Sequence, residues 1–283
     1  MSLSRRAWEI IPGLITWVTI LGLLVLARFS PRFVATFVLL FAIYWVVRII
    51  IMTSFLLAGY VRYRREQKVD WLARLKTDFP TGWENLYHMA IVPTYKEDIS
   101  ILRHTLGAIK DSNYLCQKLI VVVAFEERET ELAPGYAKIL THEFEHAFGG
   151  LLTTFHPGDI PGEVRGKGPN ITWAARRALE YIDEKKINRD DVIVTTLDAD
   201  NRVDKNYFAN VSWAFLRNPD PHHRSFQPLP MFFNNIWQVP LPVKMTAMGS
   251  SFWQMIQAMR PHHARNFSAH SQSLKALVET DFW

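Results

Sequence analysis

Residues 191–201 read Asp-Val-Ile-Val-Thr-Thr-Leu-Asp-Ala-Asp-Asn, an apolar run that leads into two carboxylates. The run from Asp191 to Leu197 is rich in β-branched residues, which favours a buried strand. Asp198 and Asp200 follow it one residue apart, and side chains two positions apart on an extended backbone point the same way. We therefore expect both carboxylates to face one ligand just beyond the end of this strand.

The chain before this run alternates between strand and helix patterns. The expected strands are 87–93, 118–123, 151–155 and 191–197, and the expected helices are 99–109 with Asp98 as its cap, 134–148 and 169–184. Alternation of this kind specifies an α/β fold with a mainly parallel sheet flanked by helices. In such sheets ligands bind beyond the carboxyl ends of the strands. Further along, residues 226–234 suggest another strand and residues 244–259 another helix.

Two apolar runs precede this domain and predict a membrane anchor with two transmembrane helices over residues 1–69. The first, Trp8 to Ala27, is long enough to span a bilayer and lacks the small-residue cleavage pattern of a signal peptide. The second, Phe33 to Tyr60, contains Arg48. Either Arg48 snorkels towards an interface, or the span ends there and residues 49–60 lie along the membrane surface.

The excess of basic residues lies beside the two apolar runs. The chain carries a net charge of +5, of which residues 1–69 contribute +7 and residues 70–283 the remaining −2. This bias disfavours a nucleic-acid partner and favours a multi-pass protein of the cell membrane whose domain 70–283 is cytosolic. Cys116 is the only cysteine, so neither an internal disulfide nor a cysteine-based zinc site can form, and a reducing compartment fits.

The two carboxylates and a lysine further upstream suggest a site for a metal and an anion. Oxygen ligands such as Asp198 and Asp200 suit Mg²⁺ or Mn²⁺, and a diphosphate is the natural partner of such an ion. Gly166-Lys167-Gly168 stands directly before Pro169, the expected start of a helix, where free amides and a lysine favour an anion. The alternatives are a solvated Asp-x-Asp turn and a flexible loop with a solvated lysine.

Taken in this order, the segments resemble the nucleotide-binding half of family 2 glycosyltransferases with the GT-A fold. The resemblance covers about residues 87–216, and the two preceding apolar runs resemble the membrane-bound polysaccharide synthase branch of that family. It rests on three stretches, which are Ile91-Val92-Pro93-Thr94-Tyr95-Lys96-Glu97, Gly166-Lys167-Gly168 and Leu197-Asp198-Ala199-Asp200.

The resemblance implies an enzyme that transfers a sugar from a UDP- or GDP-sugar to a glycan or lipid-linked acceptor. Asp198 and Asp200 would hold the Mg²⁺ or Mn²⁺ and act in catalysis. The residues implied to contact the nucleotide-sugar are Pro93, Thr94, Tyr95, Glu97, Glu126, Lys167 and Asp198.

The sequence departs from the family pattern in three places. Lys96 replaces the usual Asn. Glu126-Glu127 stand where the family commonly has an Asp that contacts the base of the nucleotide. The chain also stops before the expected general base and before a Gln-x-x-Arg-Trp signature, so we expect a fragment whose domain 70–283 is incomplete. Residues 267–283 resemble the strand and helix that lead into the base. Asp281 could be proposed as that base, but its neighbours resemble the segment before it.

A rival motif, His142-Glu143-Phe144-Glu145-His146, fits the H-E-x-x-H pattern of zinc proteases. The helical phase argues against it, because the apolar stripe of the helix predicts that both histidines face solvent. A non-catalytic membrane subunit with a retained GT-A fold is a third alternative.

Overall fold

The computed structural model describes residues 3–260, 262 and 269–282. The chain divides into two compact units, Met1–Val61 and Arg62–Trp283.

The first unit consists of two long helices, α1 (Leu3–Phe29) and most of α2 (Pro31–Glu66). Both are long and apolar enough to cross a membrane by length and composition, and their most apolar 18-residue windows have mean hydropathies of 2.4 and 2.5. The helix α2 is continuous through Arg48, so the backbone does not break at that residue. It ends in a basic turn in which Arg62 forms an ion pair with Glu66 at 2.7 Å.

The second unit is built on a six-stranded sheet, and the alternating pattern predicted its four parallel strands. Its strands are β1 (Tyr87–Pro93), β2 (Leu119–Glu126), β3 (Gly150–His156), β4 (Val192–Thr196), β5 (Ser225–Phe226) and β6 (His270–Ser273). They lie in the order β3-β2-β1-β4-β6-β5. The strands β1 to β4 are parallel, whereas β6 is antiparallel to both of its neighbours. The carboxyl ends of the four parallel strands therefore meet at one edge.

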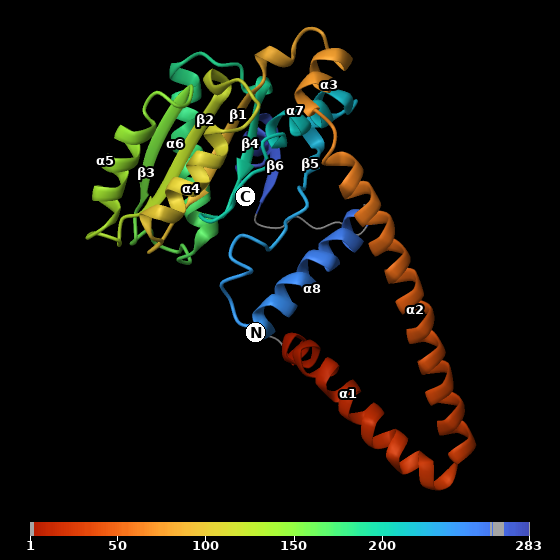
Figure 1. Ribbon diagram of the computed structural model, residues 1–283. Helices are drawn as coiled ribbons and strands as arrows, with labels where there is room; N and C mark the ends of the chain where they lie inside the picture. The colour runs from red at the N-terminus through yellow and green to blue at the C-terminus, as the bar shows by residue number, and fades with distance from the viewer. Residues whose placement is uncertain (1–2, 261, 263–268, 283) are drawn as a thin grey trace. The chain divides into compact units, whose positions relative to one another are not determined.

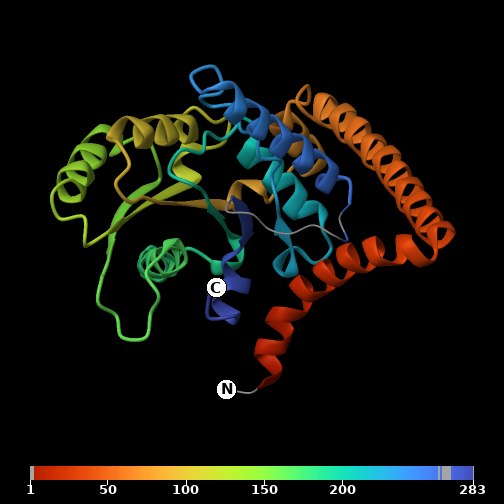
Figure 2. The ribbon, with the colours of Figure 1, turned by 90° about the horizontal axis from the view of Figure 1, so that it is seen from below.

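Helices cover both faces of this sheet (Figures 1 and 2). The helices of this unit are α3 (Trp71–Asp78), α4 (Ile99–Lys110), α5 (Ala133–Phe144), α6 (Lys167–Glu184), α7 (Tyr207–Arg217), α8 (Leu241–Ala258) and α9 (Leu274–Glu279). On one face α4, α5 and α7 pack over the strands, and α3 packs against α7. On the other face α6 and α9 form a second core. The α/β fold with helices on both faces is confirmed.

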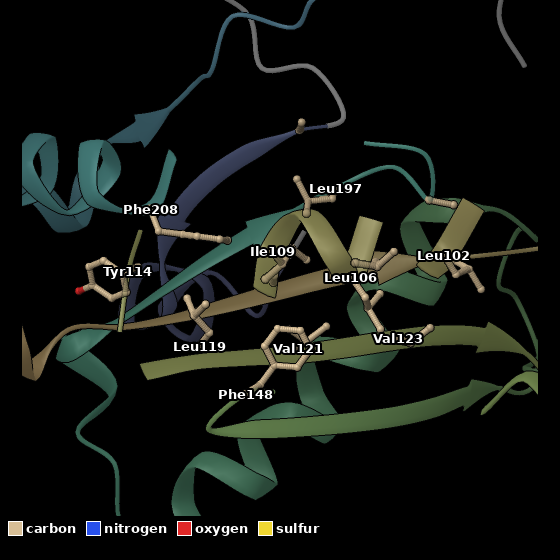
Figure 3. Packing of buried hydrophobic residues seen from close by; sticks show 14 of the residues in the cluster. Leu102, Leu106, Ile109, Tyr114, Leu119, Val121, Val123, Phe148, Leu197 and Phe208 are labelled. Atoms are coloured by element: carbon tan, nitrogen blue, oxygen red, sulfur yellow. The ribbon is translucent and has the colours of Figure 1, made fainter. Parts of the chain in front are cut away.

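The central strands are apolar on both sides, as buried parallel strands require. In β2, Val121 and Val123 face the core under α4, whereas Ile120 and Val122 face the core under α6. Figure 3 shows how Leu106 and its neighbours on α4 point down towards the first of these faces. A continuous run of Val and Ile in β2 is thus explained by burial on two sides.

Several predicted boundaries need correction. The helix α6 begins at Lys167, before Pro169, because proline is tolerated in the first turn of a helix where amide groups have no partner. The helix α5 ends at Phe144 instead of continuing to residue 148. The expected strand 226–234 is wrong beyond Phe226, since Pro228 and Pro230 cannot donate to a sheet.

A buried histidine links β1 to α7. The Nε2 atom of His88 lies 2.7 Å from the Oγ atom of Ser212, and the ring packs edge-on against Tyr114. His88 is fully buried, and desolvation of its charged form lowers the pKa of His88 to about 3, below its ordinary value of 6.5. The folded protein therefore keeps this imidazole neutral.

The buried His88 predicts a loss of stability in mild acid. Below pH 6.5 the unfolded chain binds a proton that the folded chain excludes, so the free energy of unfolding falls by about 1.4 kcal/mol per pH unit from pH 6 towards pH 3. Urea unfolding of the full chain at a series of pH values measures this slope. The variant His88→Gln removes the proton site, and an unchanged slope in that variant would contradict the assignment.

Candidate functional site

The Asp198-Ala199-Asp200 segment forms a tight turn directly after β4. The Leu197 amide still donates to the Ile91 carbonyl of β1 at 2.9 Å, and the Asn201 amide donates to the Asp198 carbonyl at 3.1 Å. The segment is therefore a turn, which corrects the expectation of extended backbone at these two carboxylates. Ala199 is buried, whereas Asp198 is half-buried and Asp200 is exposed. The turn thus anchors its middle residue and leaves both carboxylates on the accessible side of the sheet edge.

Contacts from other elements hold this turn in place. The Thr105 hydroxyl on α4 donates to the Ala199 carbonyl at 2.6 Å, in the buried layer beneath the turn. On the outer side, the Asn234 side-chain amide donates to the Asp200 carbonyl at 2.8 Å. The backbone on either side of the second carboxylate is therefore fixed by two segments that are distant in sequence.

Lys167 forms an ion pair with Asp198, between Nζ and Oδ1. Lys167 is the first residue of α6, with Gly166 as the cap. The start of the helix is tied to the sheet because the Asn170 side-chain amide donates to the Ala124 carbonyl of β2 at 2.9 Å. The Lys167 ammonium group and the positive end of α6 thus lie at the same edge of the sheet as Asp198 and Asp200, which follow β4.

The loop after β1 supplies the next group of predicted residues. Pro93 and Thr94 are buried, and the Thr94 amide continues the ladder by donating to the Ala124 carbonyl at 2.9 Å. Tyr95 is exposed at the mouth of the loop, and Glu97 is half-buried.

The same loop explains why Lys96 is unusual. Lys96 has a left-handed backbone with φ of 60°, a conformation that Asn adopts more readily than Lys. The carboxylate of Glu129 compensates by accepting a hydrogen bond from the Lys96 amide at 3.1 Å. The sequence pattern does not indicate Glu129, because this residue lies three positions beyond the end of β2.

A second cluster forms at the ends of β2 and β3. Glu126 is 3% exposed, and its Oε2 atom lies 3.4 Å from Nε of Arg128 and 3.5 Å from Nδ1 of His156. His156 is also buried, and its Nε2 atom lies 3.5 Å from Oε2 of Glu163. The Arg128 guanidinium lies 4.1 Å from the centre of the Tyr95 ring, which joins this cluster to the first loop. The rule of inspecting strand ends would also have found His156, the last residue of β3.

The predicted residues therefore gather at one edge of the sheet. The end of β1 lies between the ends of β2 and β4, and neighbouring strands are about 4.8 Å apart, so Glu126 and Asp198 start from strand ends roughly 10 Å apart. Glu126, Tyr95 and Lys167 surround this edge with carboxylate, aromatic and ammonium groups. Such a set can accept hydrogen bonds from a base, stack against a ring and neutralise an anion.

Asp281 lies outside this gathering. Its carboxylate pairs with Arg176 Nη2 at 3.1 Å and is exposed. Arg176 is nine residues beyond Lys167 along α6, or about 13 Å at 1.5 Å per residue. The structure therefore gives Asp281 no contact with the candidate site.

The histidine motif 142–146 receives no support from the geometry. The helix α5 ends at Phe144, so that His142 and His146 do not share a continuous helix, and both are exposed. The Glu143 carboxylate is held by the Arg103 guanidinium at 2.8 Å from Nε, which lowers the pKa of Glu143. Within residues 3–260, 262 and 269–282, no three His, Cys, Asp or Glu residues gather as a metal site.

Neither a family model nor a curated protein matches the sequence. Among solved structures, the chain is similar to the mannosyltransferase PcManGT from Pyrobaculum calidifontis in complex with GDP-Man and Mn²⁺, with a TM-score of 0.43 and 19% identity over 81% of this chain and 55% of that one. It is also similar to residues 1–349 of S. aureus TarS in complex with UDP-GlcNAc, with a TM-score of 0.41 and 14% identity over 69% of this chain and 48% of that one. The chain thus spans about half the length of each.

Proposed function

We propose that this chain is a membrane-anchored glycosyltransferase that takes a sugar from a UDP- or GDP-sugar and transfers it to a glycan or lipid-linked acceptor. The observation that carries the proposal is the convergence, at one sheet edge, of the Asp198-Ala199-Asp200 turn, the Lys167 end of α6 and the Glu126 cluster. These supply carboxylates for a metal ion, an ammonium group for a diphosphate, and a carboxylate beside an aromatic ring for a base.

The residues at this edge fit a hard divalent cation. Asp198 and Asp200 offer only oxygen ligands, which Mg²⁺ and Mn²⁺ prefer, and such ions commonly take one or two carboxylates together with phosphate oxygens. Among the described residues no Lys, Arg or His pairs with Asp200, so its carboxylate is accessible to an ion. A bound ion would neutralise charge on the leaving diphosphate.

The remaining groups would bind and orient the donor. The Lys167 ammonium and the free amides of the first turn of α6 attract the diphosphate. The Glu126 carboxylate can accept a hydrogen bond from a ring N–H of uracil or guanine. Tyr95, whose ring already carries the Arg128 guanidinium, offers a surface on which a base can stack.

The anchor and the branch of the family rest on the apolar helices. The helices α1 and α2 support attachment to a membrane, with the basic turn of α2 favouring a cytosolic site. The spans followed by this α/β unit support a member of family 2 related to membrane-bound polysaccharide synthases.

Nucleotide binding tests the proposal. The full chain, purified in detergent, is titrated with UDP and with GDP by calorimetry, first with Mn²⁺ and then with EDTA. We expect one of the two nucleotides to bind in the presence of Mn²⁺ and its affinity to fall strongly in EDTA. ADP should bind poorly, because adenine presents no ring N–H to Glu126. Absence of binding with any divalent cation would overturn the proposal and favour a non-catalytic membrane subunit.

A further inference from the structure

The ion pair of Lys167 with Asp198 occupies a proposed metal ligand. The side chains are 37% and 40% exposed, so the pair lies at the accessible rim of the site. Within the described part of the chain, Asp198 is the only carboxylate that pairs with Lys167. The Lys167 ammonium and a divalent metal ion would therefore compete for the Asp198 carboxylate.

The charges of the site determine when both cations can be present. A divalent ion at Asp198 would lie beside the ammonium group and be repelled by it, because solvent at the rim of a protein screens like charges only in part. A diphosphate brings negative charge and draws the ammonium away from the carboxylate. The ion and Lys167 then both have anionic partners.

We propose that Lys167 is a counter-charge that keeps Asp198 from binding a divalent cation until the diphosphate of a nucleotide arrives. This inference rests on the proposed function and adds the order of binding to it. The metal and the nucleotide then bind cooperatively, and each raises the affinity for the other by the same factor. The site would hold little metal between turnovers.

The test is Mn²⁺ binding without nucleotide, read from the electron paramagnetic resonance signal of free Mn²⁺ in the presence of the full chain in detergent. If Lys167 only helped to bind ligands, its loss would leave Mn²⁺ affinity unchanged or reduced. We expect the opposite, since Lys167→Gln removes the competing charge. The variant should bind Mn²⁺ on the order of tenfold more tightly than the parent, allowing for solvent screening of the pair.

The second measurement repeats the titration with UDP and with GDP. In the parent the nucleotide should raise Mn²⁺ affinity strongly, and in Lys167→Gln this gain should shrink. Lys167→Arg, which keeps the charge, should bind Mn²⁺ alone as weakly as the parent. Lys138→Gln removes the charge of an exposed lysine on α5 and should change nothing.

The outcomes separate this inference from the proposed function. If the parent protein binds Mn²⁺ and the nucleotide cooperatively while Lys167→Gln binds Mn²⁺ alone no more tightly than the parent, the inference is overturned and the proposed function stands. If the parent binds no Mn²⁺ with UDP or with GDP, the proposed function itself is contradicted. Circular dichroism confirms that each variant is folded.

Discussion

Asp200→Asn abolishes the Mn²⁺-dependent part of nucleotide binding, with an expected loss of at least about a hundredfold in affinity, because residues that merely support metal ligands already cost 10–100-fold. Asp200 is the cleaner of the two carboxylates to test, since Asp198 also holds Lys167. The variant keeps the shape of the side chain and the Asn234 hydrogen bond to the Asp200 carbonyl, so the effect measures the charge. Calorimetric titration with UDP and GDP, each with Mn²⁺, provides the measurement.

The matched control for this prediction is Asp111→Asn. Asp111 is exposed and ends α4, at the edge of the sheet opposite the candidate site. We expect no change in Mn²⁺-dependent binding for that variant. An Asp200→Asn protein that binds nucleotide as tightly as the parent, with the same dependence on Mn²⁺, would remove this residue from the metal site.

Gly149→Ala is expected to destabilise the second unit by about 3 kcal/mol or more, the range for substitutions that force atoms into filled space. A Cβ atom at Gly149 would lie 2.1 Å from the carbonyl oxygen of Gln117, which belongs to the backbone and cannot rotate away. The Gly149 amide also donates to the Cys116 and Leu119 carbonyls at 2.9 Å. The added methyl group would therefore push β3 away from the start of β2. Urea unfolding followed by tryptophan fluorescence measures the loss.

Gly135→Ala is the control for that substitution. Gly135 lies in the first turn of α5, and apart from its chain neighbours and the nearby helix backbone no atom lies within 4 Å of a Cβ atom built there. Alanine is favoured over glycine in helices by up to about 1 kcal/mol, so this variant should be as stable as the parent or slightly more stable. Equal destabilisation by both substitutions would show that the close approach at Gly149 does not limit the fold.

The parallel part of the sheet could be predicted because its central strands, β1, β2 and β4, are buried on both faces. The clearest case is β2, which reads Leu-Ile-Val-Val-Val-Ala-Phe-Glu, a nearly continuous apolar run rich in β-branched residues. The short strand β6 carries no such signal, since it reads His-Ser-Gln-Ser. Hydroxyl pairs compensate for the missing apolar residues, with Ser271 Oγ lying 2.8 Å from Oγ1 of Thr195 and 2.9 Å from Oη of Tyr207. Only the family resemblance of residues 267–283 predicted a strand there.

The candidate site could be predicted in its composition but not in its pairings. Lys167 and Asp198 can each be singled out in the sequence, yet their contact depends on where α6 begins beside the sheet. The sequence predicted that α6 begins at Pro169, whereas it begins at Lys167. The end of β3 indicates His156 as a candidate, but a single histidine carries no spacing pattern that identifies its partner. Its contact with Glu126 follows from the register of β2 and β3, in which the two residues are opposite each other.

The antiparallel direction of β6 has a consequence for how this scaffold can diversify. Phe226 at the end of β5 is paired with Ser271 near the start of β6. The chain therefore leaves the sheet after Phe226 and enters it again at His270 on the same edge, the one that carries the Asp198 turn. A segment whose two ends are neighbours can lengthen, shorten or change its sequence at little entropic cost and without moving the strands. The half of the unit that carries the proposed nucleotide site can then stay constant, while the intervening segment is free to change.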